Sequence, residues 1–212
     1  MIKILIVDDH PIVRKGIHDT ICEEPGMSVA GEARDGLEAL ELIRKKSFDA
    51  IILDLSLPKL GGLQVLEQIK ISYPQLPVLI LSIHSEEQYA TRSLKMGAAG
   101  FLPKDTAPDV LIAAIKKIVA GGKFVTPSQA ENVLLQFERN QTTPHDNLSN
   151  REFMVLKMIT EGKSQAEISD ILNISVKTVS TYRSRILEKL GLSNNAELIK
   201  YGIEHSLLEN VD

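Results

Sequence analysis

The chain has 212 residues, of which 43% are hydrophobic and 25% charged, and its formal net charge is −4. This composition predicts an ordinary soluble protein of one or two domains and argues against one that coats nucleic acid through bulk positive charge. A single cysteine, Cys22, excludes an internal disulfide and a cysteine-rich metal site, so we expect a cytoplasmic protein. We expect no signal peptide and no membrane partner, because no run approaches the roughly 20 apolar residues that span a bilayer.

Two patterns alternate over the N-terminal part of the chain. Short apolar, β-branched runs predict strands at residues 2–7, 28–31, 50–53, 78–82 and 100–102. Stretches with helical period follow them, at residues 10–23, 36–45, 62–72, 87–96 and 108–120. This alternation is typical of an α/β fold with a parallel sheet covered by helices on both faces. The number of βα units predicts a flavodoxin-like (βα)5 doubly wound domain at residues 1–121.

The pattern changes after this domain. Residues 122–147 are interpreted as a linker that contains a candidate helix at 126–139 and a polar, proline-containing stretch at 140–147. From residue 148 onward the pattern is helical throughout, which predicts a small all-α domain of four helices at residues 148–212. Its helix starts and ends are marked by two capping boxes, a further N-cap and a terminating glycine, namely Ser149 with Glu152, Ser164 with Glu167, Ser175, and Gly191.

Polar residues stand where the predicted strands end. Asp8 and Asp9 follow the first strand, Asp54 the third, Ser82 ends the fourth, and Lys104 follows the fifth. The carboxyl ends of parallel strands meet at one edge of the sheet, where ligands bind in such folds. Crowded carboxylates repel one another, and a hard divalent cation such as Mg²⁺ or Mn²⁺ relieves that repulsion. Asp54 could then attack a phosphoryl group while the cation and Lys104 neutralise charge on the transferring oxygens.

The alternative is that these acids are solvated loop residues. For any one aspartate this interpretation is the better one, but it does not account for the full set of five positions. The segments ILIVDDHP, AIILDLSLP, VLILS and GFLPKD resemble a CheY-like receiver domain over residues 1–121. The resemblance implies that a sensor histidine kinase phosphorylates Asp54 and that Ser82 and Lys104 engage the phosphoryl group. It also implies that Mg²⁺ is bound by Asp9, Asp54 and the backbone carbonyl of Ser56, with Asp8 acting through water.

Two features depart from many receivers. Pro103 precedes Lys104 and Asp105 follows it, so a cis-proline after the lysine is absent. Phe101 matches the aromatic switch position that works with Ser82, but it has no hydroxyl. An inward swing of Phe101 would therefore be driven by packing alone.

The C-terminal segment LSNREFMVLKMITEGKSQAEISDILNISVKTVSTYRSRILEKLGLS resembles a LuxR-type helix-turn-helix. Its second helix, residues 175–189, is basic within a domain that is not, and such a helix on a tight turn suits the major groove of double-stranded DNA. The apolar stripes of the two helices, including Ile168, Ile171 and Leu172, should be core. The residues expected to contact DNA are Lys177, Thr178, Ser180, Thr181, Arg183, Ser184, Arg185 and Lys189. The alternative is a solvated basic face.

The outward hydroxyls of Ser180, Thr181 and Ser184, with Lys177 and Arg185, are expected at base edges. Lys177, Thr178, Arg183 and Lys189 are better candidates for phosphate contacts, which position a protein without specifying sequence.

Together the two resemblances indicate the NarL/FixJ subfamily of two-component response regulators. They imply a homodimer when phosphorylated, bound to promoter half-sites, with RNA polymerase as a further candidate partner. The last helix, residues 195–205, is expected to pair the DNA-binding domains through Leu198, Ile199 and Ile203. The alternative is that these residues close the domain core. Nothing in the sequence distinguishes an activator from a repressor.

Three other functions were weighed. A haloacid dehalogenase-like phosphatase needs a second acid two residues after its nucleophile, and Ser56 stands there, so we expect no classical enzyme. A flavodoxin-like cofactor binder is disfavoured because the first loop, Asp8-Asp9-His10-Pro11, is acidic and would repel a phosphate. A DNA-binding protein without phosphorylation is disfavoured by the intact set of acids and lysine.

Overall fold

The computed structural model describes residues 1–82, 87–127, 129–131, 144–172, 174–205 and 207. The chain divides into two compact units, Met1–Leu135 and Gln136–Asp212, and the division falls within the predicted linker. Among the described helices, none is long and apolar enough to cross a membrane.

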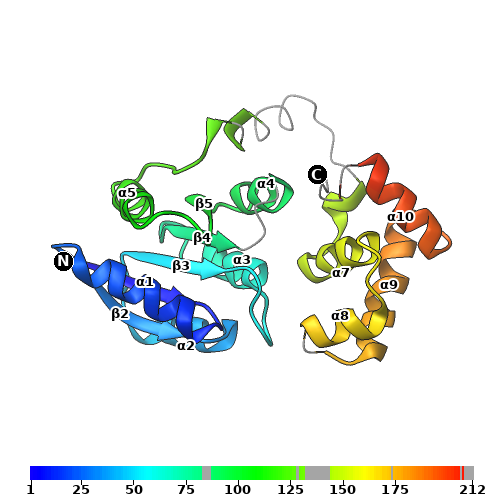
Figure 1. The fold of residues 1–212 in the computed structure, drawn as a ribbon, viewed down its shortest axis with the longest axis horizontal. Coiled ribbons are helices and arrows are strands. Elements are labelled where there is room, and N and C mark those ends of the chain that lie inside the picture. The colour runs from blue at the N-terminus through cyan, green and yellow to red at the C-terminus, as the bar shows by residue number, and fades with distance from the viewer. Residues whose placement is uncertain (83–86, 128, 132–143, 173, 206, 208–212) are drawn as a thin grey trace. The chain divides into compact units, whose positions relative to one another are not determined.

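The N-terminal unit contains a parallel five-stranded sheet with the strand order β2-β1-β3-β4-β5 (Figure 1). The strands are β1 (Ile2–Val7), β2 (Met27–Ala33), β3 (Ala50–Asp54), β4 (Val78–Ser82) and β5 (Gly100–Pro103). The helices are α1 (Pro11–Glu23), α2 (Gly36–Lys45), α3 (Gly62–Ser72), α4 (Glu87–Lys95) and α5 (Pro108–Val119). This confirms the flavodoxin-like (βα)5 fold.

The two central strands are buried throughout. Every residue of β3 and β4 is buried, as expected for strands covered on both faces, and this explains their continuous apolar sequence. Strand β2 lies at the edge and is only partly buried in its middle. Its weaker apolar signal explains why the sequence predicted residues 28–31 where the strand covers 27–33.

Helices α1 and α5 pack on one face of the sheet. Ile17 and Ile21 of α1 and Ile115 of α5 join Ile4 and Ile6 of β1 in one buried cluster. Right-handed crossovers direct α2, α3 and α4 to the other face, where α2 contacts α3. The carboxyl ends of β1, β3, β4 and β5 therefore meet at one open edge.

The outer edge of β5 is covered by the start of the predicted linker. Phe124 donates its backbone N–H to Ala99 (2.8 Å), forms a parallel bridge with Gly100, and packs against the core cluster. Lys123 donates from Nζ to the carbonyl of Ala98 at 2.7 Å. The packed part of the first unit thus extends beyond the predicted domain end at Gly121.

The candidate helix at 126–139 begins as predicted. Thr126 accepts hydrogen bonds from the N–H groups of Gln129 (to Oγ1) and Ala130 (to its carbonyl). The remainder of that predicted helix, and linker residues 140–143, lie outside the described residues.

The C-terminal unit is helical, as predicted. A short 3₁₀ helix, η1 (Pro144–Asn147), precedes α7 (Asn150–Thr160), α8 (Gln165–Leu172), α9 (Val176–Leu190) and α10 (Asn195–Glu204). The predicted capping boxes at Ser149 and Ser164 are both formed. Gly191 ends α9 with a left-handed φ of 67°, a conformation that glycine adopts without steric cost.

The core of this unit uses one narrow stripe of each helix. Ile168 and Leu172 of α8 and Val179 and Ile186 of α9 are buried. Ile171 is 54% exposed, so its predicted core position is wrong. Ile168 and Leu172 lie one turn apart on the same face, and Ile171 is rotated away from Leu172 by the helical period.

Gly100→Ala should destabilise the protein. An added Cβ would lie 2.6 Å from the carbonyl oxygen of Phe124, and relieving that clash would displace the segment that covers β5. We expect the free energy of unfolding to fall by about 1–3 kcal/mol, measured by urea unfolding. Gly16→Ala is the control. Gly16 is an exposed residue of α1, and an added Cβ there meets nothing within 4 Å, so this variant should raise the free energy of unfolding by ~0.5–1 kcal/mol. Equal stability of Gly100→Ala and wild type would contradict the close approach.

Candidate functional site

Three aspartates and a histidine converge at the carboxyl edge of the sheet. Asp8, Asp9, His10 and Asp54 each offer one potential ligand atom, and these atoms all lie within 4.8 Å of one another. Asp8 and Asp54 are 1% exposed, whereas Asp9 and His10 lie nearer the surface. The structure therefore brings together the predicted acids. The sequence analysis did not assign His10 to this cluster, although its position directly after Asp9 was the available signal.

Lys104 joins the two buried acids. Its Nζ lies 2.7 Å from Asp54 Oδ2 and 2.7 Å from Asp8 Oδ2, and its side chain is 8% exposed. The lysine is directed there because its backbone N–H donates to the carbonyl of Ser82 (2.9 Å), which extends the pairing of β5 with β4. Asp54 also accepts a hydrogen bond from the N–H of Ser56 at 3.1 Å. The phosphoacceptor candidate is thus held from both of its oxygens.

The charges of this cluster are set by burial and by pairing. Burial raises the pKa of Asp54, and the neighbouring Asp8 raises it further, against the opposing effect of Lys104. Burial lowers the pKa of Lys104, but the two carboxylates overcome this and leave it raised, so the ammonium stays charged. A bound cation would therefore stabilise the ionised form of the buried Asp54 carboxylate.

The donor set fits a hard divalent cation. Asp8 Oδ2 and Asp9 Oδ1 are buried and accept no hydrogen bond of good geometry, although Lys104 Nζ lies 2.7 Å from Asp8 Oδ2 and His10 Nδ1 lies 2.7 Å from Asp9 Oδ1. Carboxylate oxygens close to one another are the ligands that Mg²⁺ and Mn²⁺ take. Such an ion would satisfy these oxygens and offset the mutual repulsion of the acids.

The two predicted switch residues lie in the interior. Ser82 is fully buried at the end of β4, and Phe101 on the adjacent strand β5 is 1% exposed. Ile80 and Phe101 are register partners, so the aromatic ring stands on a strand that pairs directly with the one carrying Ser82. The aromatic side chain therefore occupies an inward position in this structure.

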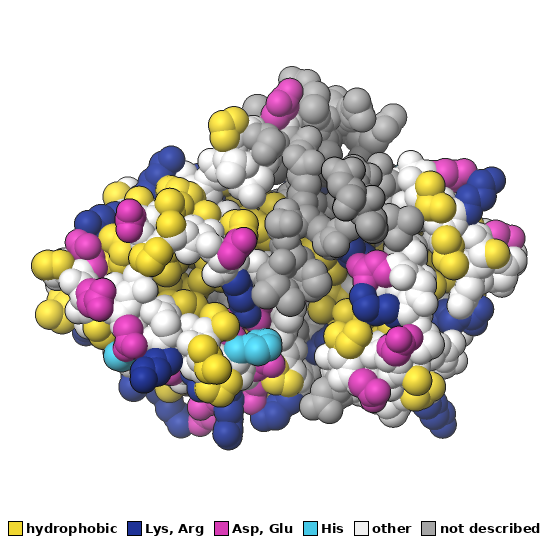
Figure 2. Space-filling view, in the orientation of Figure 1, with side chains coloured by type: hydrophobic (Ala, Val, Ile, Leu, Met, Phe, Trp, Pro, Cys, Tyr) yellow, Lys and Arg dark blue, Asp and Glu magenta, His cyan; other side chains and the backbone are white. Residues whose placement is uncertain are grey.

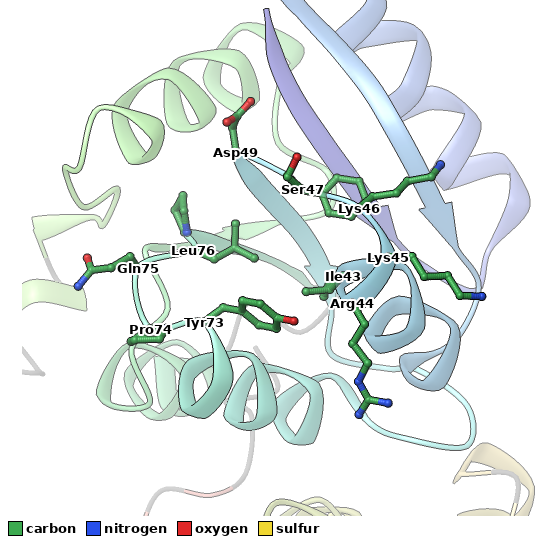
Figure 3. Close-up of a pocket in the computed structure, with 12 residues that line it drawn as sticks. Ile43, Arg44, Lys45, Lys46, Ser47, Asp49, Tyr73, Pro74, Gln75 and Leu76 are labelled. Carbon is green, nitrogen blue, oxygen red and sulfur yellow. The ribbon is translucent and has the colours of Figure 1, made fainter.

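A cavity lies at the opposite edge of the sheet. It measures about 740 Å³ and is lined by residues 43–49 and 73–77, which precede β3 and β4 (Figure 3). In Figure 3 the side chains of Arg44 and Lys45 extend away from the sheet. Because this cavity sits at the amino ends of the strands, it takes no part in the acidic cluster.

Helices α8 and α9 form the two helices of the predicted helix-turn-helix. Ser175 caps α9 by accepting from the N–H of Thr178 (3.1 Å), and its Oγ also contacts the Thr178 hydroxyl at 2.8 Å. Lys177, Thr181, Ser184 and Arg185 are exposed along α9. Figure 2 shows acidic and basic side chains interspersed on the visible face of the C-terminal unit.

Each unit matches a known family. Residues 4–116 match the response regulator receiver domain, and residues 146–201 match the luxR family of bacterial regulatory proteins. The response regulator UvrY of Escherichia coli is 36% identical over 209 residues, which cover 98% of this chain and 96% of UvrY. GacA of Pseudomonas aeruginosa is 35% identical over 211 residues, which cover 99% of each chain.

A solved structure extends this likeness to three dimensions. RcsB from Salmonella enterica serovar Typhimurium, bound to the promoter rprA in the presence of phosphomimetic BeF₃⁻, aligns with a TM-score of 0.61 and 26% identity. The alignment covers 94% of this chain and 97% of RcsB. The chain is a NarL/FixJ-family response regulator. It is a member of the two-component systems and combines a receiver domain with a LuxR-type DNA-binding domain.

Two basic residues of the regulator's α9 make contacts inside its own domain. Lys189 Nζ lies 2.7 Å from Glu152 Oε2 and 3.4 Å from the carbonyl of Asn147. Arg183 donates from Nε to Asn195 at 2.5 Å, which ties α9 to the start of α10. Both side chains therefore have contacts within the domain, and their predicted phosphate contacts stay predictions.

The three residues of α10 predicted to form a dimer surface differ in their exposure. Leu198 is fully buried within the domain, so its predicted dimer role is wrong and its side chain closes the core. Ile199 and Ile203, by contrast, are 36% and 60% exposed. The alternative interpretation therefore holds for Leu198 alone.

Lys189→Ala should destabilise the DNA-binding domain. Burial raises the pKa of Glu152, but Lys189 and the Ser149 cap together lower it, so the ionised form is stabilised in the folded domain. Removing the lysine leaves a buried carboxylate with fewer partners, at a cost of about 1 kcal/mol because the ammonium is partly exposed. Hydrogen exchange of α7 and α9 amides at pH 7 measures this loss.

The lowered pKa of Glu152 fixes the sign of the pH dependence. The stabilisation is present above the unfolded-state pKa and is lost as pH falls through the lower folded-state pKa. The difference between wild type and Lys189→Ala should therefore shrink in acid. Lys177→Ala, on the exposed face of the same helix, is the matched control and should leave the exchange unchanged.

Proposed function

We propose that this regulator accepts a phosphoryl group on Asp54 from a sensor histidine kinase, and that phosphorylation controls dimerisation, DNA binding and transcription. The observation that carries the proposal is the buried Lys104 ammonium 2.7 Å from both Asp54 and Asp8. A buried aspartate next to a lysine and to further acids is more than a fold requires. These residues supply the nucleophile and the charges that phosphoryl transfer needs.

In the proposed transfer, a carboxylate oxygen of Asp54 forms a bond to phosphorus as the P–N bond of the kinase phosphohistidine breaks. The leaving histidine nitrogen takes the electron pair. Lys104 and the N–H of Ser56 already hydrogen bond to Asp54, so they orient the nucleophile before the donor arrives. Bound Mg²⁺ or Mn²⁺, held by Asp9, Asp54 and the Ser56 carbonyl with Asp8 acting through water, would supply charge neutralisation for the phosphoryl oxygens.

The proposed switch runs through β4 and β5. A phosphoryl group on Asp54 adds negative charge that Lys104 and the Ser82 hydroxyl would both approach. Movement of Ser82 would favour the inward position of Phe101, so phosphorylation shifts a pre-existing equilibrium by its preference for that state. With no hydroxyl on Phe101, packing alone stabilises the inward ring.

On the DNA side, we assign base-edge contacts to Ser180, Thr181, Ser184 and Arg185 of α9. Thr181 and Ser184 donate their hydroxyls back to the helix (3.0 and 3.1 Å), which leaves oxygen lone pairs directed outward as acceptors. Lys177, Thr178, Arg183 and Lys189 are assigned to phosphates. The structure of RcsB bound to a promoter supports DNA as the partner.

We assign the dimer contact of the DNA-binding domains to Ile199 and Ile203, the exposed apolar residues of α10. A two-fold dimer matches paired half-sites on DNA. Control of transcription from the cytoplasm would make RNA polymerase a further partner. No classical enzyme activity is part of the proposal, beyond acquisition and loss of the Asp54 phosphoryl group.

Asp54→Ala should abolish the response to phosphorylation. With an acyl phosphate donor and Mg²⁺, wild type should incorporate phosphate, sediment as a dimer and bind promoter DNA about tenfold or more tightly, a typical coupling between two sites. The variant should do none of these and should keep the affinity of the unphosphorylated protein. If the donor changes wild type and variant equally, Asp54 is not the acceptor.

Lys177→Ala and Ser184→Ala should affect DNA binding differently. A lysine that contacts phosphate releases counterions, so its loss lowers the salt slope of log K by about 0.9 and weakens all sequences. Loss of a base contact at Ser184 should cost roughly 1–3 kcal/mol on the preferred site and little on random DNA. Titrations at three salt concentrations on both DNAs separate the two, and Lys45→Ala on α2 is the control. Parallel effects of the two variants on every DNA would overturn the assignment.

A further inference from the structure

A strained lysine holds the loop that follows the phosphoacceptor. Lys59, in the loop at residues 55–61 between β3 and α3, has a φ of 61°. Among the described residues it is the one non-glycine residue with positive φ. A side chain in this region clashes with its own backbone, so such a conformation persists where surrounding contacts impose it.

The Lys59 side chain crosses to the N-terminus of helix α2. Lys59 Nζ donates to Asp35 Oδ2 at 2.5 Å, and the Asp35 side chain is 4% exposed. The other carboxylate oxygen of Asp35 caps α2 by accepting from the N–H of Glu38 at 2.9 Å. Burial raises the pKa of Asp35, but Lys59 and the cap lower it overall, which keeps the carboxylate charged.

Close backbone packing transmits this contact along the loop. A Cβ on Gly36, the residue after Asp35, would lie 2.4 Å from the carbonyl oxygen of Leu60. A Cβ on Gly62 would lie 2.1 Å from the carbonyl oxygen of Asp54. Both ends of the loop are therefore fixed against neighbouring backbone, and Lys59 holds its middle.

The loop in turn carries a group that touches the phosphoacceptor. Ser56 donates its N–H to Asp54 Oδ1 at 3.1 Å, and its carbonyl is the proposed backbone ligand of the cation. Both Ser56 groups are backbone atoms, so no side-chain rotation can compensate for a shift of the loop. Their position depends on where the loop lies.

We propose that Lys59 and Asp35 form a latch that positions the loop at residues 55–61, and with it the Ser56 backbone, for metal binding and phosphoryl transfer at Asp54. Lys59 and Asp35 are positioning residues, since they act through Ser56 and contact neither the cation nor the phosphoryl group. The latch rests on the proposed function of Asp54. The alternative is a surface ion pair that stabilises the fold without any effect at the site.

Mg²⁺ alone is the probe that separates these alternatives. Calorimetric titration of the full chain with Mg²⁺ should give about two- to fivefold weaker binding for Lys59→Ala and for Asp35→Asn, the range of a partly exposed ion pair. Asparagine is as good an N-cap as aspartate, so Asp35→Asn removes the charge and retains the cap of α2. The double variant should be no weaker than either single variant, and Lys59→Arg should bind like wild type.

Lys59→Gly provides a readout that a purely structural role would not give. Glycine adopts positive φ without a clash, so this variant should unfold at higher urea than Lys59→Ala while binding Mg²⁺ just as weakly. The Mg²⁺ concentration for half-maximal phosphorylation by acetyl phosphate should rise by the same factor as the dissociation constant. The rate at saturating Mg²⁺ should stay within about twofold of wild type.

Lys45→Ala is the matched control, because it breaks the exposed Lys45–Glu41 pair on the same helix, α2, away from the loop. If Lys59→Ala, Lys59→Gly and Asp35→Asn all bind Mg²⁺ like this control and wild type, or if the two single effects add in the double variant, the latch is overturned. An absence of Mg²⁺ binding to wild type would also overturn it. Failure of the proposed function is a different result, in which wild type binds Mg²⁺ but Asp54→Ala is labelled equally well.

Discussion

The receiver site depends on one ammonium group shared by two buried carboxylates. Without Lys104, the buried carboxylates of Asp8 and Asp54 would face each other with no ammonium between them to relieve their repulsion. With it, one ammonium contacts both carboxylates, which supports the roles proposed above for Asp54 and Asp9. The sheet serves this arrangement, because parallel pairing brings the ends of β1, β3 and β5 to one edge.

In the second unit, the basic residues of α9 differ in their surroundings. The chain as a whole is acidic, with a formal net charge of −4, yet α9 exposes Lys177 and Arg185 on a helix capped at both ends. Lys189, at the end of that helix, is bound to buried Glu152 and fastens α9 to α7. Along this one helix, Lys177 and Arg185 are thus exposed, whereas Lys189 pairs within the domain.

Much of this could be predicted from the sequence, for identifiable reasons. Buried parallel strands have continuous apolar sequences, and the residues that end them must meet, so the sequence predicts that Asp8, Asp54, Ser82 and Lys104 lie at one edge of the sheet. Capping residues marked the helix ends for a similar reason, since their hydrogen bonds are local. Contacts between loops have no period, so the pairing of Lys59 with Asp35 and the docking of Phe124 left no signal. Helical period also could not decide which of Leu198 and Ile199 faces inward, because both border one stripe.

The docking of Phe124 on β5 has a consequence for how the receiver can be separated from the rest of the chain. An isolated receiver ending at Gly121 would lose the residue that pairs with Gly100 and would leave the outer backbone of β5 open. Open strand edges pair with other molecules, so such a fragment would be prone to self-association unrelated to phosphorylation. A cut placed beyond Thr126 would keep this edge closed, and oligomers of that fragment could be attributed to the receiver itself.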